Sequence, residues 1–546
     1  MSCIALCAVL LLHEPGLLLS ASNQDALVHD AELAAQAFNG SRKFLEGWLP
    51  QVDPVTGLLP QRLGDSPLWN THNSAADNFP FMLISAAFTR EELFQPLLEK
   101  SLVGELSQTI QLYNLPGSYD LASGKQVKLE LDRLIFGASE YAKDGLVPML
   151  EILGPGVWSE RMAALAEGVI TAAPLETSWG RLASNDCEVN GEMLQVLCRL
   201  YWMTGRKDYL EFSRRIGDAY CFEVLPGNHG VPAHYWDFSN HTGDGRLHLR
   251  DHGCEIISGL TLLYAIEKEQ GGIRADTYFP VIDRMLRRTV EIATDSMGLF
   301  YNEVDAATGK VTRGNVSDCW GYDYYAWVTM AMATGDKSYL IPVRRAIGNI
   351  NHYKDYRWEP RGDSGQSHDG IADAVEGALL LLSHLPQPGA AGWIDHEAAR
   401  MLAMQRDDGV IEGWWGDGNF ARTALMYAFW KTAGCRLSPW REDLRIAASY
   451  EGEKIKIYLN SKEPWSGKLL MDRQRHSQWL GMSNNYPRIN AFAEWYTVRP
   501  LALYHLDSDG ELGRVLTGNM LIEGIKLELS GKKPLMLNIE RAEKAK

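Results

Sequence analysis

The feature that most constrains the fold is a segment that occurs twice in the chain. Residues 186–215 and 318–345 both contain an acid, a glycine, an apolar helix, a Thr-Gly stop and a second helix that ends in two arginines. The matching positions are Glu188 with Asp318, Gly191 with Gly321, Thr204-Gly205 with Thr334-Gly335, Tyr209-Leu210 with Tyr339-Leu340, and Arg214-Arg215 with Arg344-Arg345. A match at fixed spacing indicates a repeated helical hairpin. Each copy begins with an acid at the start of a helix, so the fold and the chemistry are linked.

Apolar periodicity predicts helices over most of the chain. The expected ranges are 30–48, 73–88, 91–112, 137–153, 157–172, 187–203, 207–222, 252–270, 275–295, 320–334, 337–352, 370–384, 394–404 and 418–433. Helices 252–270 and 370–384 are apolar nearly all round, which is typical of a helix enclosed by others, whereas 275–295 is amphipathic. Long polar loops precede the enclosed helices, and such loops are usually functional. We therefore expect an inner and an outer ring of helices with loops at one rim.

This pattern resembles the six-hairpin (α/α)6 toroids of glycoside hydrolases, polysaccharide lyases and sugar epimerases. The resemblance covers residues 24–440 and rests on the repeated hairpins and the rim loops. It implies a mainly α protein whose toroid is followed by a β-sandwich-like domain. After Trp440 the sequence LRIAASYEGEKIKIYLNS alternates apolar and polar residues, which predicts a β-hairpin. The expected domains are a catalytic toroid at 23–440 and a β domain at 441–546.

The first 22 residues are expected to be a secretory signal peptide. Residues 4–20 form an apolar segment followed by small residues, although His13-Glu14-Pro15 interrupts it and no basic residue precedes it. No other run approaches the roughly 18 apolar residues of a membrane span. We therefore expect a secreted or periplasmic protein without a spanning segment.

The overall charge excludes one class of partner and leaves another open. A net charge of −16 and a pI near 5.4 argue against nucleic acid, because phosphate binding requires a basic surface. An acidic chain suits a carbohydrate substrate. The eight cysteines show no CxxC spacing, and His248 and His252 have the spacing of paired metal ligands but no third ligand pattern. We expect neither a metal nor another cofactor.

Acids at the starts of the enclosed helices are the candidate catalytic residues. A single Asp in such a position is explained by helix capping. In a toroid, however, these helix starts converge on one cavity, and glycoside hydrolysis needs two carboxyl groups, one protonated and one ionised. The preferred pair takes one acid from Asp186 or Glu188 and one from Asp251 or Asp318. His252, beside Asp251, is expected to transfer protons.

Aromatic and polar residues near the same helix starts are the candidate substrate-binding residues. Rings in Gly-rich turns suit stacking against sugar faces, and the stretch WNTHN stands just before an apolar helix. The alternatives are core packing for the rings and helix capping for the asparagines. The candidates are Trp69, His72, Asn73, Asp77, Asn190, Arg250, Trp320, Tyr322, Tyr324 and Trp415.

Two further functions remain open from the sequence. A polysaccharide lyase or sugar epimerase acting on uronate-containing glycans would use a Tyr or His base together with Arg or Asn, and residues of these types stand at the same rim. A non-catalytic glycan-binding repeat protein would usually have short, regular loops, which this chain lacks. The number of rim acids favours a glycosidase. The polar segment between Trp465 and Val498 is expected to pack at a domain interface.

Overall fold

The computed structural model describes residues 24–64, 67–358, 367–508 and 511–542. The predicted signal peptide lies outside these residues. Among the described helices, none combines the length and apolar character needed to cross a membrane. The chain is mainly helical as far as Lys431, and most of the strands of its larger sheets follow that residue.

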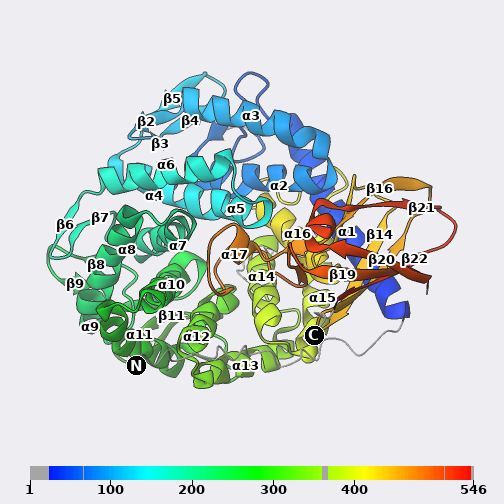
Figure 1. The fold of residues 1–546 in the computed structure, drawn as a ribbon. Helices are drawn as coiled ribbons and strands as arrows, with labels where there is room; N and C mark the ends of the chain where they lie inside the picture. The colour runs from blue at the N-terminus through cyan, green and yellow to red at the C-terminus, as the bar shows by residue number, and fades with distance from the viewer. Residues whose placement is uncertain (1–23, 65–66, 359–366, 509–510, 543–546) are drawn as a thin grey trace, which may run out of the picture.

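Helices alternate between two concentric rings (Figure 1). The inner members are η2 (Thr71–Asn78) with α2 (Phe79–Thr89), α4 (Leu131–Glu140) with η3 (Tyr141–Leu146) and α5 (Val147–Leu153), α7 (Cys187–Thr204), η5 (Asp251–Cys254) with α10 (Glu255–Gln270), α12 (Trp320–Thr334), α14 (His368–His384) and α16 (Asp417–Lys431). The outer members are α1 (Gln24–Trp48), α3 (Glu91–Gln108), α6 (Val157–Ala172), α8 (Lys207–Ala219), α11 (Ile273–Ala293), α13 (Leu340–Asn349) and α15 (Pro388–Leu402).

The inner members form a closed circle. Each contacts the next along the chain, and α16 contacts α2, so the last member meets the first. Outer helices pack against the inner ones, with α8 on α7 and α10, and α15 on α14 and α16. Within the described residues the circle has seven members, one more than the six hairpins that the resemblance implies. The expected toroid is present, and its fourteen helices pair as seven hairpins.

The repeated hairpin has the same capping in both copies. Helices α7 and α12 end at Gly205 and Gly335, whose φ values of 67° and 79° belong to the left-handed region that favours glycine. In each copy a tyrosine hydroxyl then donates to an acid on the preceding outer helix. Tyr209 bonds Glu167 at 2.9 Å, and Tyr339 bonds Asp283 at 2.6 Å. The sequence repeat therefore corresponds to a structural repeat.

The repeated glycine allows neighbouring inner helices to approach closely. A Cβ atom added at Gly191 would lie 2.4 Å from the backbone nitrogen of Ile256 on α10. At Gly321 it would lie 2.5 Å from the backbone of Gly377 on α14. Both distances are below van der Waals contact, so a larger residue would push the ring members apart.

The loops at the rim contain short antiparallel strands. These are β1 (Leu68–Trp69), β4 (Ser118–Asp120) and β5 (Lys125–Val127); β2 (Ile110–Leu112) and β3 (Leu115–Pro116); β6 (Leu175–Thr177) and β7 (Gly180–Leu182); β8 (Trp236–Asp237) and β9 (Thr242–Gly243); and β10 (Arg246–His248), β11 (Tyr301–Asp305) and β12 (Val311–Val316). The last three strands join the loop before α10 to the loop before α12.

Two antiparallel sheets follow the ring. The larger has the order β14 (Arg445–Glu451), β15 (Lys454–Asn460), β22 (Leu535–Arg541), β19 (Leu503–Ser508) and β20 (Glu511–Thr517). The smaller has the order β13 (Arg436–Ser438), β16 (Trp465–Leu470) and β21 (Ile525–Leu529). The predicted hairpin after Trp440 is confirmed, because β14 pairs with β15 and Glu451 lies opposite Lys454. Helix α1 packs against both of these strands.

The segment between β16 and β19 crosses the centre of the ring. It contains β17 (Asp472–Arg473), α17 (Arg475–Gln478) and β18 (Thr497–Val498), and α17 lies over the ring centre in Figure 1. Arg488 and Arg199 donate to Glu151 at 2.6 and 2.8 Å, and all three side chains are buried. The expected interface packing with satisfied polar groups is therefore found here.

Candidate active site

A cavity of about 240 Å³ lies where the inner helices begin. We call it the mouth cavity. Its walls are built from η2, α4, η3, α7, η5, α12, α14 and α16, with Trp415 just before the last of these. Ile489 and Asn490, from the segment that crosses the ring, also contribute to the lining. The prediction that the helix starts near 187, 252, 320, 370 and 418 share one rim is confirmed.

Eight of the predicted site residues line the mouth cavity. They are His72, Asn73, Asp77, Glu188, Asp251, His252, Tyr322 and Trp415. Asp318 is buried next to it, within electrostatic reach of Asp251 and Asp369. Arg250 places its guanidinium 3.8 Å from the carboxylate of Asp251. The structure thus gathers acids as far apart in the sequence as Asp77 and Asp369.

Two predicted aromatic residues of α12 do not line the cavity. Trp320 packs edge-on against Trp393, with ring centroids 6.4 Å apart, and Tyr324 donates its hydroxyl to the carbonyl of Gly298 at 2.6 Å. Side chains turn by about 100° per residue along a helix. Positions 320 and 324 therefore share one face, toward the outer ring, whereas Tyr322 points to the cavity.

Three other predicted site residues do not line the mouth cavity and have roles in packing or capping. Trp69 is buried in the hydrophobic core on β1. Asn190 is buried below the cavity wall, where its amide nitrogen donates to the carbonyl of Asp186 at 2.9 Å. Asp186 is the N-cap of α7, since its Oδ1 accepts the Glu188 N–H at 3.0 Å. The second acid of the sequence pair, Glu188, is the one that lines the cavity.

Several lining residues were not among the predicted site residues. They are Phe136, Glu140, Lys143, Asp144, Glu255, Cys319, Asp369, Asp373, Asn419, Arg422, Ile489 and Asn490. Asp369 and Asp373 stand at a helix start, so the same acid-before-helix signal could have selected them. Glu140 and Lys143 stand inside a continuous helical stretch, where no sequence signal distinguishes them from core or surface positions.

Four side chains form a tight group in the wall of the mouth cavity. Donor atoms of Glu140, Glu188, Glu192 and His252 all lie within 4.8 Å of one another. Both carboxylate oxygens of Glu192 are buried without a hydrogen-bond partner in the described residues. Burial and the neighbouring carboxylates raise the pKa of Glu140 and Glu192 well above the usual range. Burial, opposed by His252, also raises the pKa of Glu188.

His252 supplies positive charge to this group. Its Nδ1 lies 3.7 Å from Glu192, and its Nε2 lies 3.5 Å from Asp251. Burial alone would lower the pKa of the imidazole, but the surrounding carboxylates, with Glu140 the strongest, raise it well above its ordinary value. The second cation is Lys143, whose ammonium lies 2.7 Å from Asp144 and also pairs with Glu255. Both cations are therefore engaged with acids of the wall.

The opposite wall also holds buried carboxyl groups with a raised pKa. Burial, and then the charge of Asp251, raises the pKa of Asp318 to about 6. Burial and Asp369 raise the pKa of Asp373 well above its usual range, and Tyr322 donates a hydrogen bond to it at 3.2 Å. Arg422 pairs with Glu376 at 2.9 Å. One cavity therefore combines carboxyl groups whose pKa burial raises with the side chain of Asp251, which is 60 % exposed.

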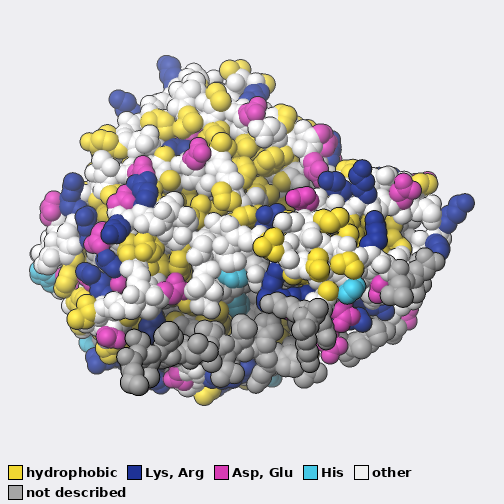
Figure 2. Space-filling view, in the orientation of Figure 1, with side chains coloured by type: hydrophobic (Ala, Val, Ile, Leu, Met, Phe, Trp, Pro, Cys, Tyr) yellow, Lys and Arg dark blue, Asp and Glu magenta, His cyan; other side chains and the backbone are white. Residues whose placement is uncertain are grey.

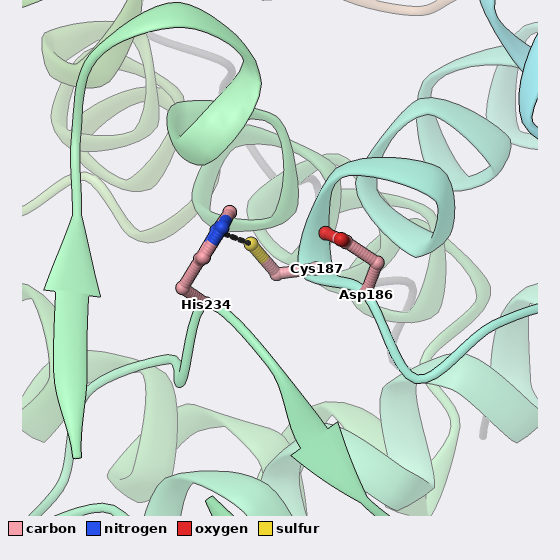
Figure 3. Close-up of side chains that lie close together, drawn as sticks. All are labelled: Asp186, Cys187 and His234. Atoms are coloured by element: carbon pink, nitrogen blue, oxygen red, sulfur yellow. Dashed lines mark hydrogen bonds between the residues drawn. The ribbon is translucent and has the colours of Figure 1, made fainter. Parts of the chain in front are cut away.

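Among the described residues, two groups have the donor types of a metal site. The first is Glu140, Glu188, Glu192 and His252, whose carboxylates and imidazole suit a divalent cation. The second is Asp186, Cys187 and His234, shown in Figure 3, where the Cys187 sulfur lies 3.7 Å from His234 Nδ1. In the second group Asp186 is already committed to capping α7. Only the first group faces the mouth cavity.

No protein-family model and no curated protein sequence matches the chain. Similar solved structures include the unsaturated glucuronyl hydrolase from Bacillus sp. GL1, with 12 % identity, a TM-score of 0.40, and coverage of 72 % of this chain and 96 % of that one. The α-1,6-mannanase from Salegentibacter sp. HEL1_6 has 12 % identity, a TM-score of 0.42, and coverage of 72 % and 98 %. The cellobiose 2-epimerase from Bacillus thermoamylovorans B4167 has 11 % identity, a TM-score of 0.39, and coverage of 59 % and 88 %. All three are named as enzymes that act on carbohydrates. Because the similarity is low, the fold and the site are established from the contacts within this chain.

Proposed function

We propose that the protein is a glycosidase that cleaves an oligo- or polysaccharide in the mouth cavity. The observation that carries this proposal is the coexistence of buried carboxyl groups, whose pKa burial raises, and an exposed carboxyl group around one cavity. Glycoside hydrolysis needs such a pair, since one carboxyl protonates the leaving oxygen while the other activates water or attacks carbon. Burial and like charge are the means by which proteins keep the first carboxyl protonated near neutral pH.

We assign the proton donor to Glu188 and its ionised partner to Asp251. Glu188 lines the cavity with a raised pKa, and the protonated neighbour Glu140 shares hydrogen bonding with it. Asp251 reaches solvent at the mouth, where water can be activated. Asp318 and His252 act on this pair through their charges, Asp318 on Asp251 and His252 on Glu188. Asp186 has a capping role in this scheme.

The charge of the mouth cavity favours a neutral sugar as substrate. Its lysine and arginine, Lys143 and Arg422, are paired with carboxylates of the wall, and His252 stands among further carboxylates. A uronate would therefore add negative charge to a lining that is already rich in acids, which disfavours lyase or epimerase action on uronate glycans. Trp415 offers an aromatic face, and His72 and Asn73 offer polar contacts, for a sugar ring.

The test is product analysis with a panel of neutral and uronate-containing oligosaccharides. The proposal expects new reducing ends from neutral glycans, no absorbance of an unsaturated uronate, and far slower product formation with Glu188→Gln. An unsaturated product would replace hydrolysis with elimination, and a changed sugar of unchanged length would indicate epimerisation. Saturable binding without any product would support the glycan-binding alternative.

We also propose that catalysis requires no metal. Lys143 and His252 already place two cations among the acids of the wall, and a divalent ion would be repelled by both. Dialysis against a chelator should leave turnover unchanged. A loss that is restored by one added metal would instead assign an ion to Glu140, Glu188, Glu192 and His252.

The remaining sequence expectations also stay as proposals. We propose export through a signal peptide at 1–22, a catalytic domain at 23–440 and a β domain at 441–546 whose two sheets pack as a sandwich. Release of the first 22 residues on export would be read by N-terminal sequencing of the mature protein.

A further inference from the structure

A second cavity, of about 290 Å³, lies at the opposite end of the ring. We call it the junction cavity, because the ends of α2, α5, α14 and α16 meet there with residues of the strands and of the crossing segment. Figure 2 shows dark-blue Lys and Arg side chains among yellow ones along the junction of ring and strands. Ligand cavities are common at such junctions between structural units.

Arg436 and Arg473 line the junction cavity without a carboxylate partner. In the described part of the chain, neither guanidinium makes a hydrogen bond or an ion pair. Each lies over an aromatic ring instead, Arg436 at 5.3 Å from the centroid of Phe88 and Arg473 at 5.3 Å from that of Trp479. Stacking of this kind leaves the guanidinium N–H edges available to another acceptor.

The two acids that line the junction cavity are already engaged. Asp472 accepts from Arg475 at 3.2 Å, Glu376 pairs with Arg422 at 2.9 Å, and these are the acids among the lining residues. Burial lowers the pKa of Arg436 and of Arg473. The charges of Asp472 and of the more distant Glu91 and Glu523 oppose this effect, whereas the charge of Arg473 adds to it at Arg436. The two guanidiniums therefore form a partly buried positive pair whose charge the surrounding residues compensate only in part.

We propose that the junction cavity binds a small oxyanion, a carboxylate or a phosphate, between the guanidiniums of Arg436 and Arg473. Arginine presents a planar fork of donors that matches both anions. Phe88, Trp479 and Trp495 give the cavity apolar walls, so an organic anion with an apolar part fits the same space. The site is separate from the mouth cavity and does not depend on the proposed hydrolysis.

Calorimetry on the full chain with three small molecules tests the proposal. Inorganic phosphate represents the free oxyanion, benzoate represents a carboxylate with an apolar part, and benzyl alcohol is the uncharged analogue of benzoate. We expect saturable binding of at least one anion and none of the alcohol. Binding of benzoate alone would assign an organic carboxylate, and binding of phosphate alone would assign a phosphoryl oxyanion. Equal binding of the alcohol, or no saturable binding of either anion up to roughly 10 mM, would overturn the proposal.

Variants locate the binding. Arg436→Gln and Arg473→Gln should each weaken anion binding by roughly tenfold or more, because each removes charged donors. Arg287→Gln, on the outer surface of α11, is the matched control and should bind as tightly as the parent protein. Equal weakening by all three variants, or by none, would contradict the assignment. If Arg436→Gln does not fold, as judged by circular dichroism, the more exposed Arg473→Gln decides.

Discussion

The two ends of the helical ring differ in charge. Carboxyl groups crowd the mouth cavity, whereas arginines line the junction cavity. All inner helices begin at the mouth and end at the junction, so their backbone dipoles add, with the positive ends at the mouth and the negative ends at the junction. Each end thus concentrates side chains of the charge that its dipoles stabilise. A ring of parallel inner helices can therefore separate acidic from basic side chains along its axis and support two chemically different sites.

The largest expected effect falls on the acidic end. Glu188→Gln removes the proposed proton donor and keeps the shape of the side chain, so turnover should fall by about 10² to 10⁴. The melting temperature should stay close to that of the parent protein. Turnover and thermal unfolding are measured together, with Asp336→Asn as the control, because Asp336 caps an outer segment by accepting the Ser338 N–H at 2.8 Å. Near-normal turnover in Glu188→Gln would contradict the assignment of the proton donor at the acidic end of the ring.

The second prediction concerns the buried ion pairs between the ring and the segment that crosses it. Glu151 is buried between Arg199 and Arg488, and these guanidiniums hold its pKa near 2 against the effect of burial. Glu151→Gln leaves two buried cations without a carboxylate and should lower the free energy of unfolding by about 3–5 kcal/mol. Urea unfolding measures the loss.

The control for that experiment is an exposed pair on the ring surface. Glu442→Gln removes one of the two carboxylate partners of Arg42, the other being Glu46, and the loss should stay below about 1 kcal/mol. Similar losses in both variants would show that the buried charges do not join the crossing segment to the ring.

A third prediction concerns pH. Burial raises the pKa of Asp318 from 3.8 to about 6. Between these two pH values the folded protein therefore keeps a proton on Asp318 that the unfolded chain releases. Its contribution to stability is therefore greatest below pH 4 and falls as the pH rises through 6. Compared with Asp318→Asn, the parent protein should lose roughly 1–3 kcal/mol of unfolding free energy across that window. Parallel stability curves for the two proteins between pH 4 and 7 would contradict the buried, crowded environment of Asp318.

The smallest expected effect concerns Asp186, which separates capping from catalysis at the same helix start. Asn caps well, so Asp186→Asn should change the unfolding free energy by less than about 1 kcal/mol and keep most of the turnover. Asp186→Ala removes the acceptor for the Glu188 N–H and should cost about 1 kcal/mol. A large loss of turnover in the Asn variant would return Asp186 to the catalytic group.

The ring and its acidic end could be predicted because their signals are local. Helix periodicity, the Thr-Gly stops and the acids before helices predict that Glu188, Asp251 and Asp318 lie near one rim. The facing of single residues within a helix could not be predicted as easily, so Trp320 and Tyr324 were assigned to the cavity although they point to the outer ring. Their position follows from rotation along α12, which requires knowledge of where the cavity lies.

Other parts of the site depend on contacts that no local pattern contains. Glu140 and Lys143 reach the cavity where α4 continues into the π-helical segment η3, whose altered winding redirects side chains. Asn490 reaches it from a segment more than 300 residues further along the chain, where it donates to Asp144 at 2.8 Å. The junction cavity is likewise formed only when ring and strands meet.

The contact of Asn490 with Asp144 also has a consequence for biosynthesis. The ring helices are complete at Lys431, yet the inner surface of the mouth cavity includes residues 489 and 490. A ribosome must therefore release about sixty residues beyond the last ring helix before the proposed active site can close. During that interval the mouth cavity lacks part of its lining, so enzymatic activity becomes a late event in the synthesis of each molecule, reached only after residues 489 and 490 have emerged.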